Sequence, residues 1–122
     1  MDSVAISVII IDDDSAVRDS LFVLLSFAGF SIIAFESAHD YLAVIENHDP
    51  DCLIIDLHMP RIGGIELINA LGELGNTVPI IVISGNMDKN NKAQAEQAGA
   101  SRFLKKPFAG KLLIETIHGL VK

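Results

Sequence analysis

Residues 8–15 read VIIIDDDS, a run of four β-branched residues that stops abruptly at three aspartates. β-branched residues favour strands, whereas Asp and Ser favour the first turn of a helix, so the segment predicts a strand that leads directly into a helix. Three more apolar runs end in a similar way: residues 53–55 before Asp56, residues 80–83 before Ser84, and residues 103–104 before Lys105, Lys106 and Pro107. If these runs are neighbouring parallel strands, their ends bring carboxylates, one hydroxyl and one ammonium group into a single crevice.

Strand and helix patterns alternate along the whole chain. We expect strands at residues 4–11, 31–35, 51–55, from Pro79 and at 100–104, and helices at residues 15–28, after Ser37 as N-cap, from Gly64, at 90–98 and at 108–121. This alternation predicts one α/β domain over residues 1–122, with a five-stranded parallel sheet and helices on both faces. Five such units suit the flavodoxin-like (βα)5 strand order 2-1-3-4-5, in which ligands gather at the switch point between the first and third strands.

Apolar residues at helical spacing indicate which face of each helix is buried. The fourth helix has only alanines for this purpose, so we expect it to be the most weakly anchored element, because alanine buries little area. Gly29 and Gly99 are predicted to end the first and fourth helices. The other predicted buried positions are Val17, Leu21, Leu24 and Leu25; Tyr41, Leu42 and Ile45; Ile65, Ile68, Leu71 and Leu74; and Leu112, Leu113, Ile117 and Leu120.

Composition excludes several classes of protein. The 122 residues are 50% hydrophobic and carry a net charge of −7 without a basic cluster, so direct binding of nucleic acid is not expected. No apolar run is long enough for a transmembrane helix, and the start MDSVAISV lacks the pattern of a signal peptide. The lone Cys52 lies in an apolar run, excludes an intramolecular disulfide and fits a cytoplasmic protein.

The three aspartates admit two interpretations. One is a capped turn, with Asp14 or Ser15 as the N-cap of the helix that follows. A cap needs one carboxylate, however, and three adjacent like charges repel one another unless a cation relieves them. We therefore expect Asp14 to be the cap and Asp12 and Asp13 to be ligands of Mg²⁺ (or Mn²⁺), which is held by few carboxylates together with water and phosphate.

Asp56, Ser84 and Lys106 each have an ordinary interpretation, as a residue that begins a turn or as a solvated charge. Their shared position at strand ends favours a common site instead. Asp56 would face the first acidic cluster, where a carboxylate can act as a nucleophile and form an acyl phosphate. Ser84 could donate a hydrogen bond to a phosphoryl oxygen, and Lys106 could neutralise its charge. Pro107 makes the bond before it a candidate cis peptide.

These motifs resemble those of the receiver domain of bacterial response regulators, and the resemblance spans the chain. IIIDDDSAVRDSL is similar to the family's acidic-pair motif, and CLIIDLHMPRIGGIEL is similar to its phosphoacceptor motif. The resemblance implies that Asp56 is the phosphoacceptor. It also implies that Asp12, Asp13 and Asp56 bind the metal together with the backbone carbonyl of His58.

The segments VISG and FLKKPF resemble two further motifs of the family. They imply that Ser84 is the switch hydroxyl, that Lys106 is the conserved-type lysine before a cis proline, and that Phe103 is the aromatic residue that turns inward on activation. The implied function is a phosphorylation-dependent switch of a two-component system and not an enzyme in the ordinary sense. A sensor histidine kinase would phosphorylate Asp56 and thereby remodel the face of the fourth helix, fifth strand and fifth helix.

Two positions depart from the commoner choices of the family. His58 replaces the more usual Met, Asn or Arg, and Gly85 replaces the frequent alanine. Both flank the path of an attacking water, so we expect them to tune dephosphorylation. The combined pattern resembles receivers of the nitrogen-fixation regulator type, which precede a helix-turn-helix domain. On this resemblance, the chain is either a single-domain regulator or a fragment whose output or DNA-binding domain lies outside this sequence. The sequence also leaves open a monomer and a phosphorylation-driven homodimer through the remodelled face.

Two alternatives remain open at this point. A Mg²⁺-dependent phosphatase of the haloacid-dehalogenase type also carries an Asp-x-Asp motif after a strand, although this chain is short and has no cap insertion. A receiver that is never phosphorylated and serves only protein–protein contact would lack an acidic, acceptor or lysine residue, and none is missing here.

Overall fold

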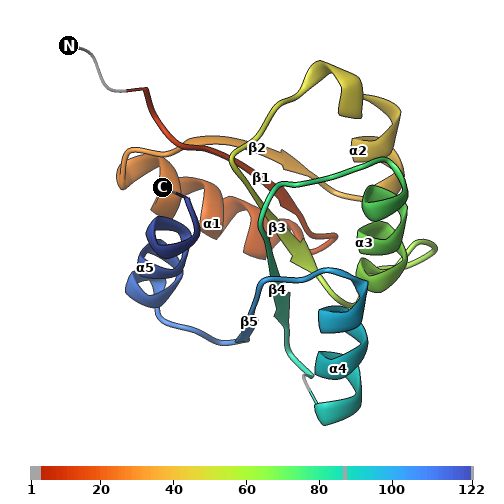
Figure 1. The fold of residues 1–122 in the computed structure, drawn as a ribbon. Coiled ribbons are helices and arrows are strands. Elements are labelled where there is room, and N and C mark those ends of the chain that lie inside the picture. Colours follow the sequence, from red (N-terminus) through yellow and green to blue (C-terminus); the bar gives the residue numbers. More distant parts are fainter. Residues whose placement is uncertain (1–3, 87, 122) are drawn as a thin grey trace.

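A computed structural model of the chain describes residues 4–86 and 88–121. Within these residues a five-stranded parallel sheet has the order β2-β1-β3-β4-β5, which confirms the predicted α/β architecture (Figure 1). The strands are β1 (Ser7–Ile11), β2 (Ser31–Phe35), β3 (Cys52–Asp56), β4 (Ile80–Ser84) and β5 (Arg102–Lys105). The helices are α1 (Ser15–Phe27), α2 (Ala38–Ala43), α3 (Gly64–Glu73), α4 (Lys89–Ala98) and α5 (Gly110–Leu120), with a 3₁₀ turn, η1 (Ile45–Asn47), after α2.

Two apolar layers cover the two faces of the sheet. One face packs against α1 and α5, and the other packs against α2, α3 and α4. The strands β3 and β4 are buried along their whole length, as is β1 after its first residue. Burial on both faces explains why these strands are continuous aliphatic runs rather than alternating ones.

Local sequence accounts for the helix ends. The carboxylate of Asp14 accepts hydrogen bonds from the backbone of Ala16 (2.9 Å) and Val17 (3.3 Å), so it is the N-cap of α1, as predicted. The hydroxyl of Ser37 caps α2 by accepting from the backbone N–H of Asp40. Gly29 ends α1 with φ 98°, a conformation that glycine adopts without a steric penalty.

Several predicted positions were wrong. Leu74 is 66% exposed and Leu112 is 46% exposed, although both were expected to be buried. The buried face of α3 runs instead through Leu67, Ile68 and Leu71, because the helix is rotated about its axis and Leu74 lies at its cap. The predicted helix around Tyr41 also ends early, so Ile45 lies in η1.

Three elements begin two or more residues later than predicted, and one of them is β5, which begins at Arg102 rather than at residue 100. β1 begins at Ser7 rather than at residue 4, since its pairing with β2 begins at Ser7↔Ser31. α5 begins at Gly110 rather than at residue 108, because Ala109 still has an extended backbone (φ −72°, ψ 136°).

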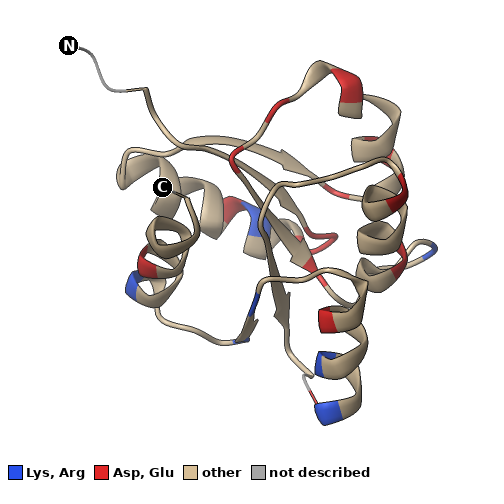
Figure 2. Cartoon of the chain, in the orientation of Figure 1, with Lys and Arg blue, Asp and Glu red and all other residues tan. Residues whose placement is uncertain are grey.

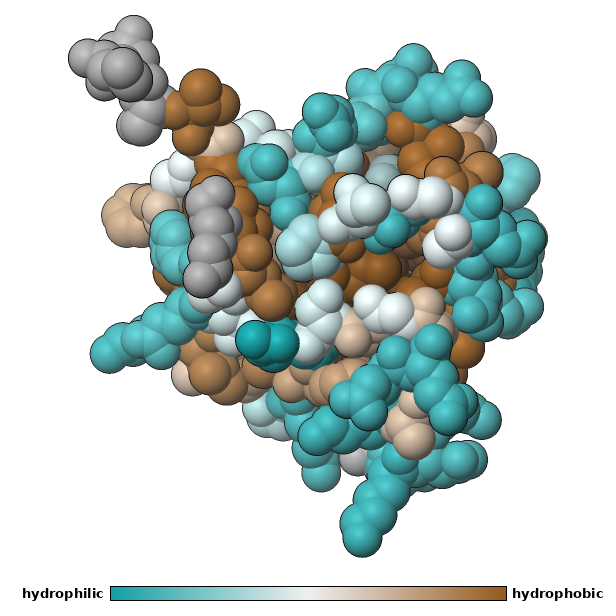
Figure 3. Space-filling model, viewed as in Figure 1, coloured by the Kyte–Doolittle hydropathy of each residue, from teal (hydrophilic) through white to brown (hydrophobic). Residues whose placement is uncertain are grey.

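α4 buries less of its surface than the other helices that the structure describes. Ala95 is its only buried residue among those that the structure describes, which agrees with the expected weak anchoring. In Figure 3 the surface at the bottom, where Figure 1 places α4, is mostly hydrophilic. No helix in the described part of the chain is long and apolar enough to cross a membrane.

Candidate functional site

The candidate residues lie at the carboxyl ends of four strands, along one edge of the sheet. Asp12 directly follows β1, Asp56 is the last residue of β3, Ser84 is the last residue of β4, and Lys106 directly follows β5. The register aligns these ends, with Asp56 opposite Ile83 in neighbouring strands. Figure 2 shows acidic segments where β1 and β3 end. The predicted meeting of polar strand ends therefore occurs, at the switch point between β1 and β3.

Asp12, Asp13 and Asp56 form an acidic cluster at this edge. Each offers a carboxylate oxygen, and these oxygens lie within 4.8 Å of one another. Asp12 is fully buried and Asp56 is 5% exposed, whereas Asp13 is open to solvent. Buried carboxylates with hard oxygen donors fit a small divalent cation, and the cluster could hold one.

Backbone N–H groups hold two of these carboxylates in place. One oxygen of Asp12 accepts a hydrogen bond from the backbone N–H of Asp14 (2.9 Å), and one oxygen of Asp56 accepts from that of His58 (3.3 Å). The backbone carbonyl of Asp12 accepts from the guanidinium of Arg18 (2.8 Å). Nothing in the sequence pattern pointed to Arg18, since it occupies an ordinary position in the first turns of α1.

Lys106 supplies the positive charge of the site. Its Nζ lies 3.0 Å from Oδ2 of Asp12 and 3.7 Å from Oδ1 of Asp56. The bond between Lys106 and Pro107 is a cis peptide. The lysine side chain is 23% exposed, so its ammonium group reaches both buried carboxylates while one side remains open to solvent.

Burial and charge shift the protonation of these groups. Burial, followed by the negative charge of Asp12, raises the pKa of Asp56 to about 6, although Lys106 and the His58 N–H oppose the shift. Burial lowers the pKa of Lys106, but the hydrogen bond to Asp12 and the nearby carboxylates outweigh that effect, so the pKa is raised overall. Asp56 is thus mostly ionised at neutral pH and Lys106 is fully charged, as a nucleophile beside a cation would need to be.

Ser84 is fully buried at the end of β4. Its hydroxyl accepts a hydrogen bond from the backbone N–H of Asn86 (3.1 Å), and its carbonyl accepts from the N–H of Lys106 (2.7 Å). Within residues 4–86 and 88–121, the hydroxyl proton of Ser84 meets no acceptor. At Gly85 an added Cβ would meet no atom within 4 Å, so the backbone there borders open space.

Asn86 and Asn91 make contacts that the sequence pattern did not indicate. The carbonyl of Asn86 lies 3.2 Å from Nε2 of His58 and accepts a hydrogen bond from Nδ2 of Asn91 (3.1 Å). These bonds join three segments, namely the loop after β3, the loop after β4 and the first turn of α4. Only the spacing of Ser84 and Asn86, which is typical of a hydroxyl-capped turn, could have indicated one of them.

Phe103 lies away from the carboxylates, on the α4 side of β5. Its half-buried ring packs against the core layer beneath α3 and α4. Nζ of Lys92 in α4 lies 5.4 Å from the centre of this ring, a distance at which a cation and an aromatic face attract. The ring therefore connects β5 to α4 rather than to the acidic cluster.

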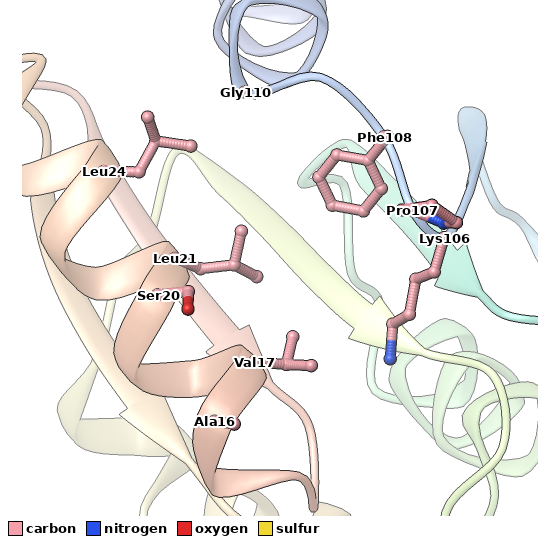
Figure 4. Close-up of a pocket in the computed structure, with 9 residues that line it drawn as sticks. All are labelled: Ala16, Val17, Ser20, Leu21, Leu24, Lys106, Pro107, Phe108 and Gly110. Carbon is pink, nitrogen blue, oxygen red and sulfur yellow. The ribbon is translucent and has the colours of Figure 1, made fainter.

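An apolar groove borders the site beside Lys106. It lies between α1 and the segment that leads into α5, and its volume is about 500 Å³. In Figure 4, Val17 and Leu21 of α1 face this segment, with Phe108 on the opposite wall and the lysine Nζ at one end.

Comparison with known proteins assigns the chain to a family. The family model of the response regulator receiver domain matches residues 8–118. Response regulator MprA of Mycobacterium sp. (strain KMS) is 33% identical over 117 residues, which cover 96% of this chain and 51% of MprA. Transcriptional regulatory protein FixJ of Rhizobium meliloti (strain 1021) is 39% identical over 109 residues, which cover 89% of this chain and 53% of FixJ. The chain thus spans about half the length of these curated relatives.

A solved structure supports the fold. The chemotaxis protein CheY4 of Vibrio cholerae has a TM-score of 0.91 to this chain at 23% identity, over 97% of this chain and 100% of CheY4. The resemblance deduced from the sequence is therefore confirmed at the level of fold and family. The family match also removes the reason for considering a haloacid-dehalogenase-type phosphatase.

Proposed function

The chain belongs to the response regulator receiver domain family of two-component systems, and from this premise we propose that Asp56 is its phosphoacceptor. The observation that carries the proposal is the surroundings of Asp56, which combine two further carboxylates with an ammonium group 3.7 Å away. Asp12 and Asp13 would share the metal with Asp56 and with the backbone carbonyl of His58. The receiver domain would extend over residues 1–122.

The reaction transfers a phosphoryl group from a phosphohistidine of a sensor histidine kinase. A carboxylate oxygen of Asp56 attacks phosphorus, the phosphorus–nitrogen bond breaks, and the imidazole leaves as neutral histidine after it takes up a proton. The product is an acyl phosphate on Asp56. The ammonium of Lys106 lies where it can neutralise a phosphoryl oxygen, and its partner Asp12 keeps it charged. A bound Mg²⁺ (or Mn²⁺) would supply charge neutralisation for the other oxygens.

Ser84 links the phosphoryl group to the output face. Its hydroxyl has a proton to donate, so it would turn toward a phosphoryl oxygen once Asp56 is modified. Phe103 would then move inward, and α4, β5 and α5 would present a changed surface to an output domain or to a second copy of the chain. The weak apolar anchoring of α4 favours such a movement, because switching elements come from regions of low local stability.

The partners follow from the family and from the relatives. The donor protein has to reach Asp56, so it would also cover the apolar groove beside Lys106. Because both curated relatives are about twice as long as this chain, we infer an output domain beyond it, of the transcription-regulating kind that the name of FixJ indicates. Such signalling would take place in the cytoplasm, where kinase and regulator meet.

One experiment tests the acceptor directly. The wild-type chain and Asp56→Asn are incubated with acetyl phosphate, with and without Mg²⁺, and the intact mass is recorded. We expect one phosphoryl group on the wild type in the presence of Mg²⁺ and none on Asp56→Asn, while Asp19→Asn, an exposed aspartate in α1, behaves as the wild type. Phosphorylation of Asp56→Asn, or phosphorylation that does not depend on Mg²⁺, would contradict the proposal.

A further inference from the structure

The main chain of Asn86 is held from three directions. Its N–H donates to the hydroxyl of Ser84 (3.1 Å), and its carbonyl lies 3.2 Å from Nε2 of His58 and 3.1 Å from Nδ2 of Asn91. A carbonyl only accepts hydrogen bonds, so Nε2 of His58 must carry a proton here. We call this arrangement, made by Ser84, Asn86, His58 and Asn91, the Asn86 clasp. It ties the loop between β4 and α4 to the loop after β3 on one side and to α4 on the other.

The clasp bears on the position of α4 because this helix buries little apolar area. Ala95 is the only fully buried residue of α4 among those described, whereas α1 and α5 each bury two large aliphatic residues. Alanine loses little area to solvent, so apolar burial contributes little to the position of this helix. The hydrogen bond from Asn91 to the Asn86 carbonyl therefore contributes more to holding this helix in place than one such bond would in a helix with a larger buried face.

The clasp is weakened if the Ser84 side chain moves toward a phosphoryl group. If the side chain changes rotamer to reach such a group, its oxygen leaves the N–H of Asn86, and the loop loses one of the contacts that hold it. We propose that Asn91 is a positioning residue that holds this loop and α4 in the unphosphorylated arrangement, and that its bond to Asn86 breaks on activation. This proposal rests on the proposed function, since it concerns the conformational change that follows phosphorylation of Asp56.

Removal of the Asn91 amide should therefore favour activation. One hydrogen bond between neutral groups has a net value that corresponds to a change of about twofold to tenfold in an equilibrium. Because the bond exists in one arrangement only, Asn91→Ala should shift the balance toward the active arrangement by that factor. Phosphorylation by acetyl phosphate should then be faster by a similar factor, since the competent conformation is more populated.

The chain offers a matched control in the neighbouring residue. Asn90 has the same side chain and lies in the same turn, but it is exposed, and in the described part of the chain its amide makes no hydrogen bond. Asn90→Ala therefore reproduces the change in helix propensity without the loss of the clasp. The carboxylate of Asp88 accepts a hydrogen bond from the backbone N–H of Asn91, and this cap is retained in both variants.

Two measurements on both variants test the proposal. Hydrogen exchange of the unphosphorylated proteins should show faster exchange of the amide of Asn86 in Asn91→Ala than in Asn90→Ala. Intact-mass kinetics with acetyl phosphate and Mg²⁺ should show faster phosphorylation of Asn91→Ala than of Asn90→Ala. The double variant that also carries Asp56→Asn should not be phosphorylated. If no protein is phosphorylated, the proposed function fails while hydrogen exchange still tests the clasp. If Asn91→Ala matches Asn90→Ala in either measurement, the positioning role of Asn91 is overturned.

Discussion

The ammonium of Lys106 lies 3.0 Å from the carboxylate of Asp12, a contact between residues 94 positions apart in the sequence. Asp12 is fully buried, so the ammonium of Lys106 is a partner that solvent cannot replace. Removal of one member of a buried ion pair leaves the other charge uncompensated. The pair therefore fixes the end of β5 against the end of β1 as well as serving the site.

Lys106→Met should lower the free energy of unfolding at neutral pH by about 3 kcal/mol. The reason is that Asp12 and Asp56 would then be buried side by side without a positive charge. Urea unfolding in the presence of a chelator measures the effect. Lys105→Met is the matched control, since Lys105 is exposed. Saturating Mg²⁺ should restore part of the lost stability, and equal stability of the two variants without Mg²⁺ would contradict the assigned role of the pair.

The stability of the protein should depend on the protonation of Asp56. Its pKa is about 6 in the folded protein, above the ordinary 3.8, mainly because of burial. The folded protein then binds more protons than the unfolded chain between these values, so the free energy of unfolding falls as the pH rises through them. Above the folded pKa this penalty is complete and is on the order of 2–3 kcal/mol.

Asp56→Asn removes that penalty. Without Mg²⁺ it should be more stable than the wild type at neutral pH by the amount just given, and the difference should shrink toward about pH 4. Urea unfolding of both proteins across this pH range tests the prediction, with Asp19→Asn as the control for loss of an exposed charge. A difference that does not change with pH would show that burial and charge at Asp56 are not its cause.

Asp13 should matter for the metal and not for the fold. It is exposed and belongs to the acidic cluster. Asp13→Asn should raise the dissociation constant for Mg²⁺ by at least about tenfold, the effect typical of altered metal surroundings. The rise in melting temperature on addition of Mg²⁺ gives the affinity, because a ligand of the folded state stabilises by mass action. If Asp19→Asn raised the dissociation constant for Mg²⁺ equally, the role of Asp13 as a metal ligand would be contradicted.

The residues of the site could be predicted from the sequence, whereas the contacts around them could not. Parallel strands place their ends at one edge, so the polar residues after four aliphatic runs were enough to predict that Asp12, Asp56, Ser84 and Lys106 meet. The Asn86 clasp could not be found in this way. Its hydrogen bonds join loops, and loop geometry leaves no periodic pattern in a sequence.

The rotation of α3 was equally beyond the sequence. Apolar residues at 65, 67, 68, 71 and 74 cover more than one helix face, so their spacing is compatible with two rotations. Packing against β3 and β4 selects the face that contains Leu67 and leaves Leu74 in solvent. Helical periodicity identified the element, and tertiary contacts determined its orientation.

His58 should control the lifetime of the phosphoryl group. Its ring reaches from the loop after β3 to the carbonyl of Asn86. Since His58 lies two residues after Asp56, we expect the ring to flank the path of an attacking water. His58→Ala opens that path, so the phosphoryl half-life should shorten by roughly threefold as water is excluded less well. Decay of the phosphorylated mass after removal of the donor measures it. His39→Ala, which changes an exposed histidine elsewhere, should leave the half-life as it is, and an unchanged half-life in His58→Ala would count against the role.

Gly64 should be required for the position of Asp56 itself. A Cβ at Gly64 would lie 2.6 Å from the carbonyl oxygen of Asp56 and 2.7 Å from Cα of Leu57, and both neighbours are backbone atoms that cannot turn away. Gly64→Ala should therefore lower the free energy of unfolding by about 2 kcal/mol, as is typical of overpacking. It should also slow phosphorylation, because α3 can accommodate the methyl group only if β3, which carries Asp56, shifts.

Gly72 provides the control within the same helix. An added Cβ there would meet no atom within 4 Å, so Gly72→Ala brings only the gain in helix propensity. Its free energy of unfolding should rise by about 0.5–1 kcal/mol, and its phosphorylation rate should not change. If the two substitutions change the free energy of unfolding in opposite directions, contact with β3, and not the helix itself, requires glycine at position 64. If Gly64→Ala were as stable and as readily phosphorylated as Gly72→Ala, the close approach of α3 to Asp56 would not be required for stability or for phosphorylation.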